Sequence, residues 1–334
     1  MGLDGSPLTA IRRADTLLYG RPMHDRRFRF GLACSKGRSR KEFTELARKA
    51  ESLGYSTLFV PDHFVEHDLA PTVALAHAAA VTDELRVGTF VLGNDYKHPV
   101  VCAREMASLD LLSDGRLELG IGAGWMTADY EKAGIPLDRA GIRIARLAEA
   151  ITIIKGLFAP GPFTFEGEYY RVTDLDGMPK PVQAPVPFFV GGGAPKILAL
   201  AAREAEIVGI NANLRSGDGT SPDAAKSMTP EATDQKLGWV RDAAGDRFGD
   251  IELQSLVGFV YVTDDAKRIL EGIANSFGVS VEDARLAPPC LVGTEDDIVA
   301  SLEERRERWQ MSYHVVEDGA IDTFAPIVAR LAGK

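Results

Sequence analysis

Short apolar runs alternate with amphipathic stretches along most of the chain. Residues 57–60 form an apolar run typical of a strand buried on both faces. The stretch before it, 42–53, places its apolar side chains on one face and ends at Gly54, which is typical of a helix. The predicted strands are 28–34, 57–60, 86–91, 116–121, 187–190, 207–210, 255–262 and 313–316. The predicted helices are 42–53, 71–81, 100–112, 142–158, 197–205, 266–277, 295–309 and 323–331.

Eight strands that alternate with helices predict an α/β protein with a (β/α)8 TIM barrel. An open doubly wound sheet is less suitable, because it has fewer units and no Gly-x-Gly-x-x-Gly follows the first strand. We expect residues 1–27 to form a flexible N-terminal arm and residues 28–334 a single barrel domain. Insertions at the C-terminal mouth are expected at about 160–186, with a hairpin at Glu166-Gly167, and at 214–235, a mobile loop rich in Gly, Ser and Asp.

The charge and the cysteine content of the chain limit the kinds of binding partner that we expect. The chain has 38 Lys and Arg against 48 Asp and Glu, a net charge of −10, so it lacks the positive field that drives nucleic-acid binding. Cys34, Cys102 and Cys290 are widely spaced, with no CxxC pair and no metal-ligand cluster. No run of 18 apolar residues predicts a membrane span. We expect a cytoplasmic protein with reduced thiols, a small-molecule substrate, and no metal, membrane or nucleic-acid partner.

The active site of such a barrel lies at the carboxyl ends of the strands, where the second predicted strand leads into Asp62 and His63. A histidine exchanges protons near neutral pH, and a neighbouring carboxylate can hold its tautomer. The alternative is a structural pair that satisfies the loop backbone.

Two glycine-rich strand ends complete the candidate chemistry. Gly191, Gly192 and Gly193 precede Pro195-Lys196, so backbone N–H groups and a helix N-terminus could bind a phosphate there. A plain turn is the alternative, although it would need one glycine rather than three. The glycines 120, 122 and 124 would let a flat ring pack closely, or would serve helix–strand packing. The carboxylates show no pairing of the kind that a glycosidase needs.

Six segments in order resemble the luciferase-like flavin and deazaflavin oxidoreductases, especially their coenzyme F420-dependent branch. The resemblance covers about residues 28 to 332, and its strongest part runs from Leu109 to Trp125. The segments are 61–64, 86–91, 98–99, 109–125, 189–193 and 291–294.

The resemblance implies a barrel that holds F420, or alternatively FMN, at its C-terminal mouth. His63 matches the catalytic histidine of the F420-dependent dehydrogenases, and a non-prolyl cis peptide is implied at Phe90-Val91. A homodimer is implied, with the helices near the second and third strands at its interface. The implied cofactor-binding residues are Asp62, Phe90, Val91, Ala123, Gly124, Gly191, Gly192, Gly193 and Ala194, and the implied substrate-pocket residues are Cys34, Trp125 and Tyr130.

The implied activity is hydride transfer between C5 of F420 and a small organic substrate, with reduction of a C=C, C=N or C=O group. Glucose-6-phosphate oxidation is not expected, because Trp125 replaces the acid of the sugar-phosphate dehydrogenases. Their tryptophan is also replaced near His67, and the first strand end, Cys34-Ser-Lys36, lacks their glutamate. An FMN-dependent monooxygenase, a non-catalytic flavin-binding protein and an unrelated barrel hydrolase or aldolase are the alternatives. Lys36, Arg38 and Arg40 could form a basic rim for the acidic tail of F420, or be a solvated loop.

Overall fold

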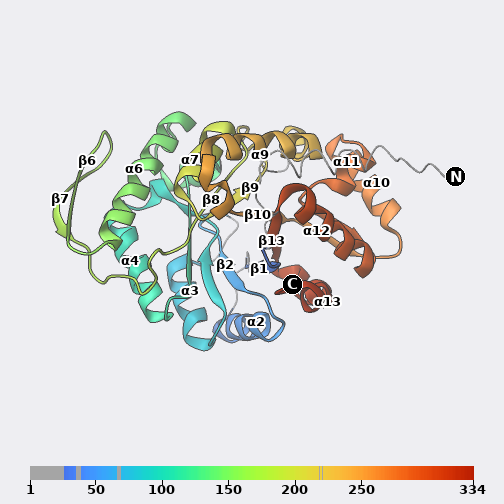
Figure 1. The fold of residues 1–334 in the computed structure, drawn as a ribbon, viewed down its shortest axis with the longest axis horizontal. Coiled ribbons are helices and arrows are strands. Elements are labelled where there is room, and N and C mark those ends of the chain that lie inside the picture. The colour runs from blue at the N-terminus through green and yellow to red at the C-terminus, as the bar shows by residue number, and fades with distance from the viewer. Residues whose placement is uncertain (1–25, 35–38, 66–68, 218, 220) are drawn as a thin grey trace.

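Eight parallel strands close into a barrel in the computed structural model, which describes residues 26–34, 39–65, 69–217, 219 and 221–334 (Figure 1). Each strand pairs with its neighbour in the ring, and the pairings of β3 with β5 and of β13 with β1 close it. The predicted (β/α)8 barrel is therefore confirmed. The barrel strands are β1 Arg29–Ala33, β2 Thr57–Val60, β3 Arg86–Thr89, β5 Leu117–Gly122, β8 Phe188–Gly192, β9 Ile207–Ile210, β10 Glu252–Val257 and β13 Met311–Glu317.

Helices surround the barrel (Figure 1). The residues at their N-termini explain where several of them begin. Ser39 and Glu42 form a capping box at the first helix, and a proline occupies the first turn of α3, α4 and α7. The outer helices are α2 Arg40–Ser52, α3 Pro71–Val81, α4 Pro99–Leu112, α6 Ala140–Phe158, α7 Pro195–Glu204, α9 Pro230–Ala244, α12 Glu295–Trp309 and α13 Ile321–Leu331. Shorter or peripheral helices are α5 Thr127–Ala133, α8 Pro222–Lys226, α10 Ala266–Phe277 and α11 Val281–Leu286.

The structures of the two insertions agree only in part with the expectations from the sequence. An antiparallel hairpin of β6 Pro162–Glu166 and β7 Arg171–Asp176 confirms the expected hairpin and projects from one side of the barrel (Figure 1). The expectation of a loop throughout 214–235 is wrong, because α8 and the start of α9 lie inside it. Both helices begin with a hydroxyl N-cap followed by proline, at Ser221 and Thr229.

The predicted strand 255–262 is also wrong as a single element. It divides at Gly258, after which β11 Phe259–Val262 leaves the barrel and pairs with β12 Cys290–Gly293 in a separate parallel sheet. Both halves are rich in apolar residues, so the pattern alone did not reveal the break. A further two-residue strand, β4 Leu92–Gly93, pairs in parallel with the carboxyl end of β5.

Two phenylalanines fill the centre of the barrel because glycines on neighbouring strands leave room for them. A Cβ on Gly88 would come 2.3 Å from Cε1 of Phe59, and a Cβ on Gly209 would come 2.8 Å from Cε2 of Phe189. The Phe90 ring stacks on Phe189 with 5.4 Å between ring centroids. Among the described residues, the centre of the barrel is thus a packed core rather than a ligand cavity.

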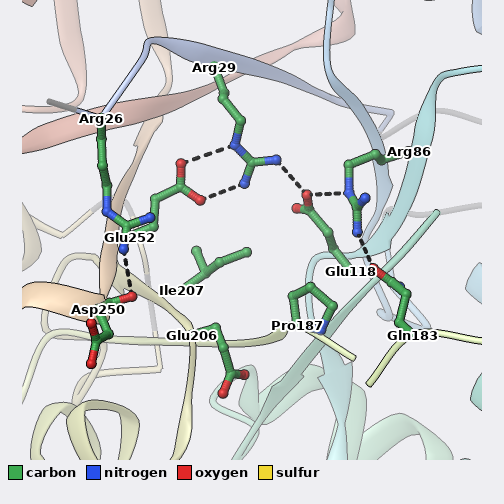
Figure 2. A pocket seen from close by; sticks show the side chains of 10 residues that line it. All are labelled: Arg26, Arg29, Arg86, Glu118, Gln183, Pro187, Glu206, Ile207, Asp250 and Glu252. Carbon is green, nitrogen blue, oxygen red and sulfur yellow. Dashed lines mark hydrogen bonds and ion pairs between the residues drawn. The ribbon is translucent and has the colours of Figure 1, made fainter. Parts of the chain in front are cut away.

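The amino end of the barrel is closed by an ion-pair network, which we call the floor: Arg29, Arg86, Glu118, Glu252 and Tyr313. Glu118 accepts hydrogen bonds from Arg29 at 2.7 Å, Arg86 at 2.9 Å and the Tyr313 hydroxyl at 2.9 Å. Arg29 also donates two bonds to Glu252, and a cavity of about 260 Å³ lies beside this network (Figure 2). Burial alone would raise the pKa of Glu118, but the charges of Arg29 and Arg86 outweigh it and lower that pKa.

Several sequence-based expectations concern residues outside the described part of the chain: most of the N-terminal arm, Lys36 and Arg38 of the basic rim, and His67. Within the described ranges, no group of three His, Cys, Asp or Glu side chains could hold a metal ion. None of the helices described is long and apolar enough to cross a membrane.

Candidate active site

Asp62 and His63 lie directly beyond the carboxyl end of β2, at the end of the barrel that we call the mouth. Asp62 Oδ2 accepts a hydrogen bond of 3.0 Å from the backbone N–H of Gly93. Burial raises the pKa of Asp62, although this bond and the nearby Lys97 charge act in the opposite direction. The half-buried carboxylate of Asp62 is therefore tied to the turn after β3.

His63 is held by a carboxylate that the sequence did not point to. Its Nδ1 lies 2.5 Å from Oδ2 of Asp129, a residue of α5 with no exposed surface. The other oxygen of Asp129 accepts the N–H groups of Phe64 at 2.9 Å and Val65 at 3.0 Å. The Tyr96 hydroxyl donates to Oδ2 at 3.3 Å. The sole sequence signal was that Asp129 lies shortly after the glycine-rich end of β5, where it falls in the first turn of α5.

The three expected substrate-pocket residues occupy different surroundings. Trp125 meets His63 edge to face, with 5.6 Å between ring centroids. Tyr130 has no exposed surface, and its hydroxyl donates to Asp95 at 3.0 Å. A Cβ on Gly124 would come 1.9 Å from that hydroxyl, so Tyr130 packs behind Gly124. Cys34 is buried at the end of β1, where its N–H donates to Phe59.

The turn after β3 contains a cis peptide bond between Phe90 and Val91, at the position that the resemblance implied. Glycines of β5 make room for this turn. A Cβ on Gly122 would come 2.7 Å from Val91 Cγ2, and one on Gly120 would come 2.0 Å from the Thr89 carbonyl oxygen. Gly120 and Gly122 therefore serve close packing of strands, and Ala123 and Gly124 follow them at the mouth, where Arg143 donates to both of their carbonyls.

The end of β8 and the turn after it bring three glycines against neighbouring backbone and side chains. A Cβ would come 2.6 Å from Asn211 Nδ2 at Gly191, 2.3 Å from Ile197 at Gly192, and 2.2 Å from the Ala212 carbonyl oxygen at Gly193. Helix α7 starts at the next residues with Ala194 as its N-cap, and no side chain caps it. Such an uncapped N-terminus favours an anion. The N-terminus of α7 would suit the phosphate group that F420 and FMN have in common, whereas contacts within the protein already require the three glycines.

A buried lysine fastens the segment that follows β9. Lys236 of α9 donates to the carbonyl oxygen of Asn211 at 2.7 Å and to that of Ser227, so it joins both ends of the segment. Within this segment, a Cβ on Gly219 would come 3.8 Å from the Trp125 ring. The segment therefore lies next to Trp125 at the mouth. No pattern in the sequence singles out Lys236.

The segment with the strongest resemblance, 109–125, has a structural role in its first half. Asp110 accepts the backbone N–H groups of Val182 and Gln183, at 2.7 and 2.9 Å. Arg116 donates to the carbonyls of Ala79 and Leu85. These bonds tie loops together away from the mouth.

Comparison with known proteins adds the family. Residues 27–228, more than half of the chain, match the model of a family described as luciferase-like monooxygenase. The chain belongs to the luciferase-like monooxygenase family. The luciferase-like match includes His63, Asp129, Trp125 and the turn after β8.

Individual relatives are similar over a shorter stretch. The chain is 32% identical over 175 residues to a protein of Intrasporangium calvum named F420-dependent glucose-6-phosphate dehydrogenase, covering 50% of this chain and 52% of that one. It is 36% identical over 186 residues to a protein of the same name from Microbacterium testaceum, covering 53% and 55%. The chain thus spans about half the length of the curated relatives it matches.

A solved structure shows the same luciferase-like fold over almost the whole chain. The coenzyme F420 dependent tetrahydromethanopterin reductase from Methanopyrus kandleri superimposes with a TM-score of 0.71 and 20% sequence identity. The match covers 91% of this chain and 99% of that structure.

Proposed function

We propose that this protein is an F420-dependent oxidoreductase that transfers a hydride between C5 of the deazaflavin and a small organic substrate, reducing a C=C, C=N or C=O group. The carrying observation is that one end of the barrel combines a carboxylate-held histidine, His63, with the three-glycine turn before the uncapped helix α7. The names of the relatives, F420-dependent dehydrogenases, support this choice of cofactor.

The residues of the mouth divide into those that hold the cofactor and those that meet the substrate. The N-terminus of α7 and the turn 191–194 would hold the phosphate, and Asp62 the polar edge of the ring. Phe90, Val91, Ala123 and Gly124 would border the ring. When bound, F420 accepts or delivers a hydride at C5, so the protein has to supply orientation and proton exchange.

His63 is proposed to exchange a proton with the substrate or to stabilise negative charge that develops on it. Trp125 provides an indole wall beside His63, where a sugar-phosphate dehydrogenase would present an acid. We therefore propose a substrate with an apolar part rather than a sugar phosphate. Tyr130 supports Gly124 from behind and lies outside the reacting space.

The first test is a titration of the purified protein with oxidised F420 and, in parallel, with FMN, followed by fluorescence quenching. Tight F420 binding with weak FMN binding is expected. The reverse preference would favour an FMN-dependent monooxygenase, which the family description also suggests. Binding without turnover of any enone, imine or ketone would favour a non-catalytic flavin-binding protein, and the absence of binding would contradict the proposal.

The second test replaces His63 with alanine. Turnover with reduced F420 should fall by about 10²- to 10⁴-fold, the usual contribution of a general acid–base group. The Kd for F420 should stay within about threefold. His77→Ala is the matched control, because His77 contacts Thr44 between α2 and α3 and should leave turnover unchanged. Normal turnover in His63→Ala would refute the catalytic assignment.

A homodimer is proposed from the surface of α3 and α4. Val73 of α3 is 72% exposed and Leu112 of α4 is 74% exposed, and Val101 and Leu111 add further apolar surface on α4. Light scattering should report a dimer for the wild type and a monomer for Leu112→Glu. A wild-type monomer at micromolar concentration would contradict this proposal.

A further inference from the structure

Asp129 has no role in the proposed function, although it is the fully buried partner of the catalytic candidate. We propose that Asp129 is a positioning residue that keeps the ring proton of His63 on Nδ1, so that Nε2 is the nitrogen that exchanges a proton with the substrate. This inference rests on the proposed function for its catalytic consequence, but the tautomer itself can be measured without any cofactor.

Apart from His63, the hydrogen-bond partners of the Asp129 carboxylate among the described residues are all donors. Oδ1 accepts two backbone N–H groups, and Oδ2 accepts the Tyr96 hydroxyl and faces Nδ1 of His63. An ionised carboxylate offers acceptors only, so a neutral imidazole at 2.5 Å has to present an N–H to it. The tautomer with the proton on Nδ1 meets this requirement, and the other tautomer would place two lone pairs against each other.

The same carboxylate also fixes the segment that carries His63. The two backbone donors belong to Phe64 and Val65, the residues that follow His63 in the chain. Asp129 thus controls both the position of the turn and the orientation of the ring. The other charged groups nearby have partners of their own: Asp62 accepts from Gly93, Lys97 pairs with Glu105, and Asp95 pairs with Arg146.

Asp129→Asn should reverse the tautomer while preserving the shape of the site. Because both backbone N–H groups point at Oδ1, the amide oxygen of asparagine has to take that position. Its NH₂ group then faces Nδ1 of His63, which has to become an acceptor, and the ring proton moves to Nε2. A comparable substitution beside the histidine of serine proteases gives the wrong tautomer and lowers kcat by about 10⁴-fold.

The tautomer is read by ¹⁵N NMR of histidine-labelled protein without cofactor, at a pH of about 8.5, well above the ordinary histidine pKa. The His63 signals are identified as those missing in His63→Ala. We expect protonated Nδ1 in the wild type and protonated Nε2 in Asp129→Asn. A wild-type ring protonated on Nε2 would overturn the proposal, and this measurement needs no folded variant at position 129.

Kinetics then test whether the tautomer matters. Asp129→Asn should lower kcat by about 10²- to 10⁴-fold, with the Kd for F420 within about threefold. Tyr96→Phe is the matched control, because it removes the other side-chain donor to the same oxygen and leaves the tautomer alone; its kcat should stay within about threefold. Full activity in Asp129→Asn would refute the positioning role and leave the proposed function intact. If the tautomer is reversed in Asp129→Asn but the wild type itself turns over no substrate, the Asp129 assignment stands and the proposed function fails.

Discussion

The carboxylates of the floor and those of Asp62 and Asp129 at the mouth are compensated differently. At the floor, Glu118 and Glu252 contact arginine side chains directly (Figure 2). At the mouth, Asp62 accepts a backbone N–H, and Asp129 accepts two backbone N–H groups and faces a histidine. The pKa shifts follow this division: burial raises the pKa of Asp62, whereas arginine charges overcome burial at Glu118 and lower its pKa.

The difference indicates which end is built for stability and which for chemistry. A buried ion pair with both partners present is tolerated, and loss of one partner leaves an uncompensated charge. Polar groups that are held by the backbone, without a full counter-charge, remain able to interact with a ligand. In TIM barrels generally, the amino end contributes to stability and the carboxyl end holds the active site.

The largest expected effect comes from breaking the floor. Glu118→Gln leaves Arg29 and Arg86 without their shared counter-charge, and the free energy of unfolding should fall by about 3–5 kcal/mol. Denaturant unfolding measures this loss. The folded fraction should still bind F420 with an unchanged Kd, because the floor lies at the opposite end of the barrel from His63.

The matched control makes the same substitution in an exposed ion pair. Glu282 pairs with Arg285 on the surface, so Glu282→Gln should change stability by less than about 1 kcal/mol. An equal loss in both variants would show that burial of the floor network is irrelevant, and the contrast between the two ends would then fail.

The second effect concerns Lys236, a buried cation on the mouth side that bonds to carbonyl oxygens and, among the residues described, to no carboxylate. Burial lowers the pKa of Lys236 to about 8. Between this value and the ordinary one, the unfolded chain binds more protons than the folded protein, so stability rises with pH. Relative to Lys236→Met, the wild type should gain about 3 kcal/mol from pH about 7.5 to about 10.5.

Comparing wild type and variant cancels the titration of all other groups, so unfolding free energies at the two pH values suffice. Lys267→Met provides the control, because the Lys267 side chain is solvent-exposed and its removal should produce no such gain. A flat difference between wild type and Lys236→Met would mean that Lys236 is compensated as fully as the floor arginines.

The sequence predicted the barrel well because buried parallel strands leave a local signature. The runs 57–60 and 207–210 were located to the residue, since both faces of these strands are buried. The break at Gly258 was missed because apolar residues continue beyond it, and α9 was missed because its start lies within a polar, loop-like stretch.

The candidate site was predictable only where its chemistry is local. His63 and the glycine turn stand out by residue type at strand ends. Asp129 lies 66 residues from its partner His63, so the contact exists only after the barrel has closed. Tyr130, the next residue, turns toward Asp95 instead of the mouth, which no spacing rule could indicate.

The smallest expected change in stability is a gain rather than a loss, and it tests the contrast between the mouth and the floor most directly. Asp62→Asn retains an oxygen for the Gly93 N–H and removes a charge that burial disfavours, so stability near pH 7 should rise by about 1 kcal/mol. The same variant should weaken F420 binding by about tenfold, since a charged acceptor is lost.

The stability gain of Asp62→Asn should depend on pH. Because the folded-state pKa of Asp62 is raised, the gain should shrink as the pH falls through that pKa and the wild-type carboxyl becomes neutral. Unfolding and binding titrations at two pH values measure both quantities. If Asp62→Asn lost stability as Glu118→Gln does, the mouth carboxylate would be as fully compensated as the floor, and the two ends would not differ in the way proposed.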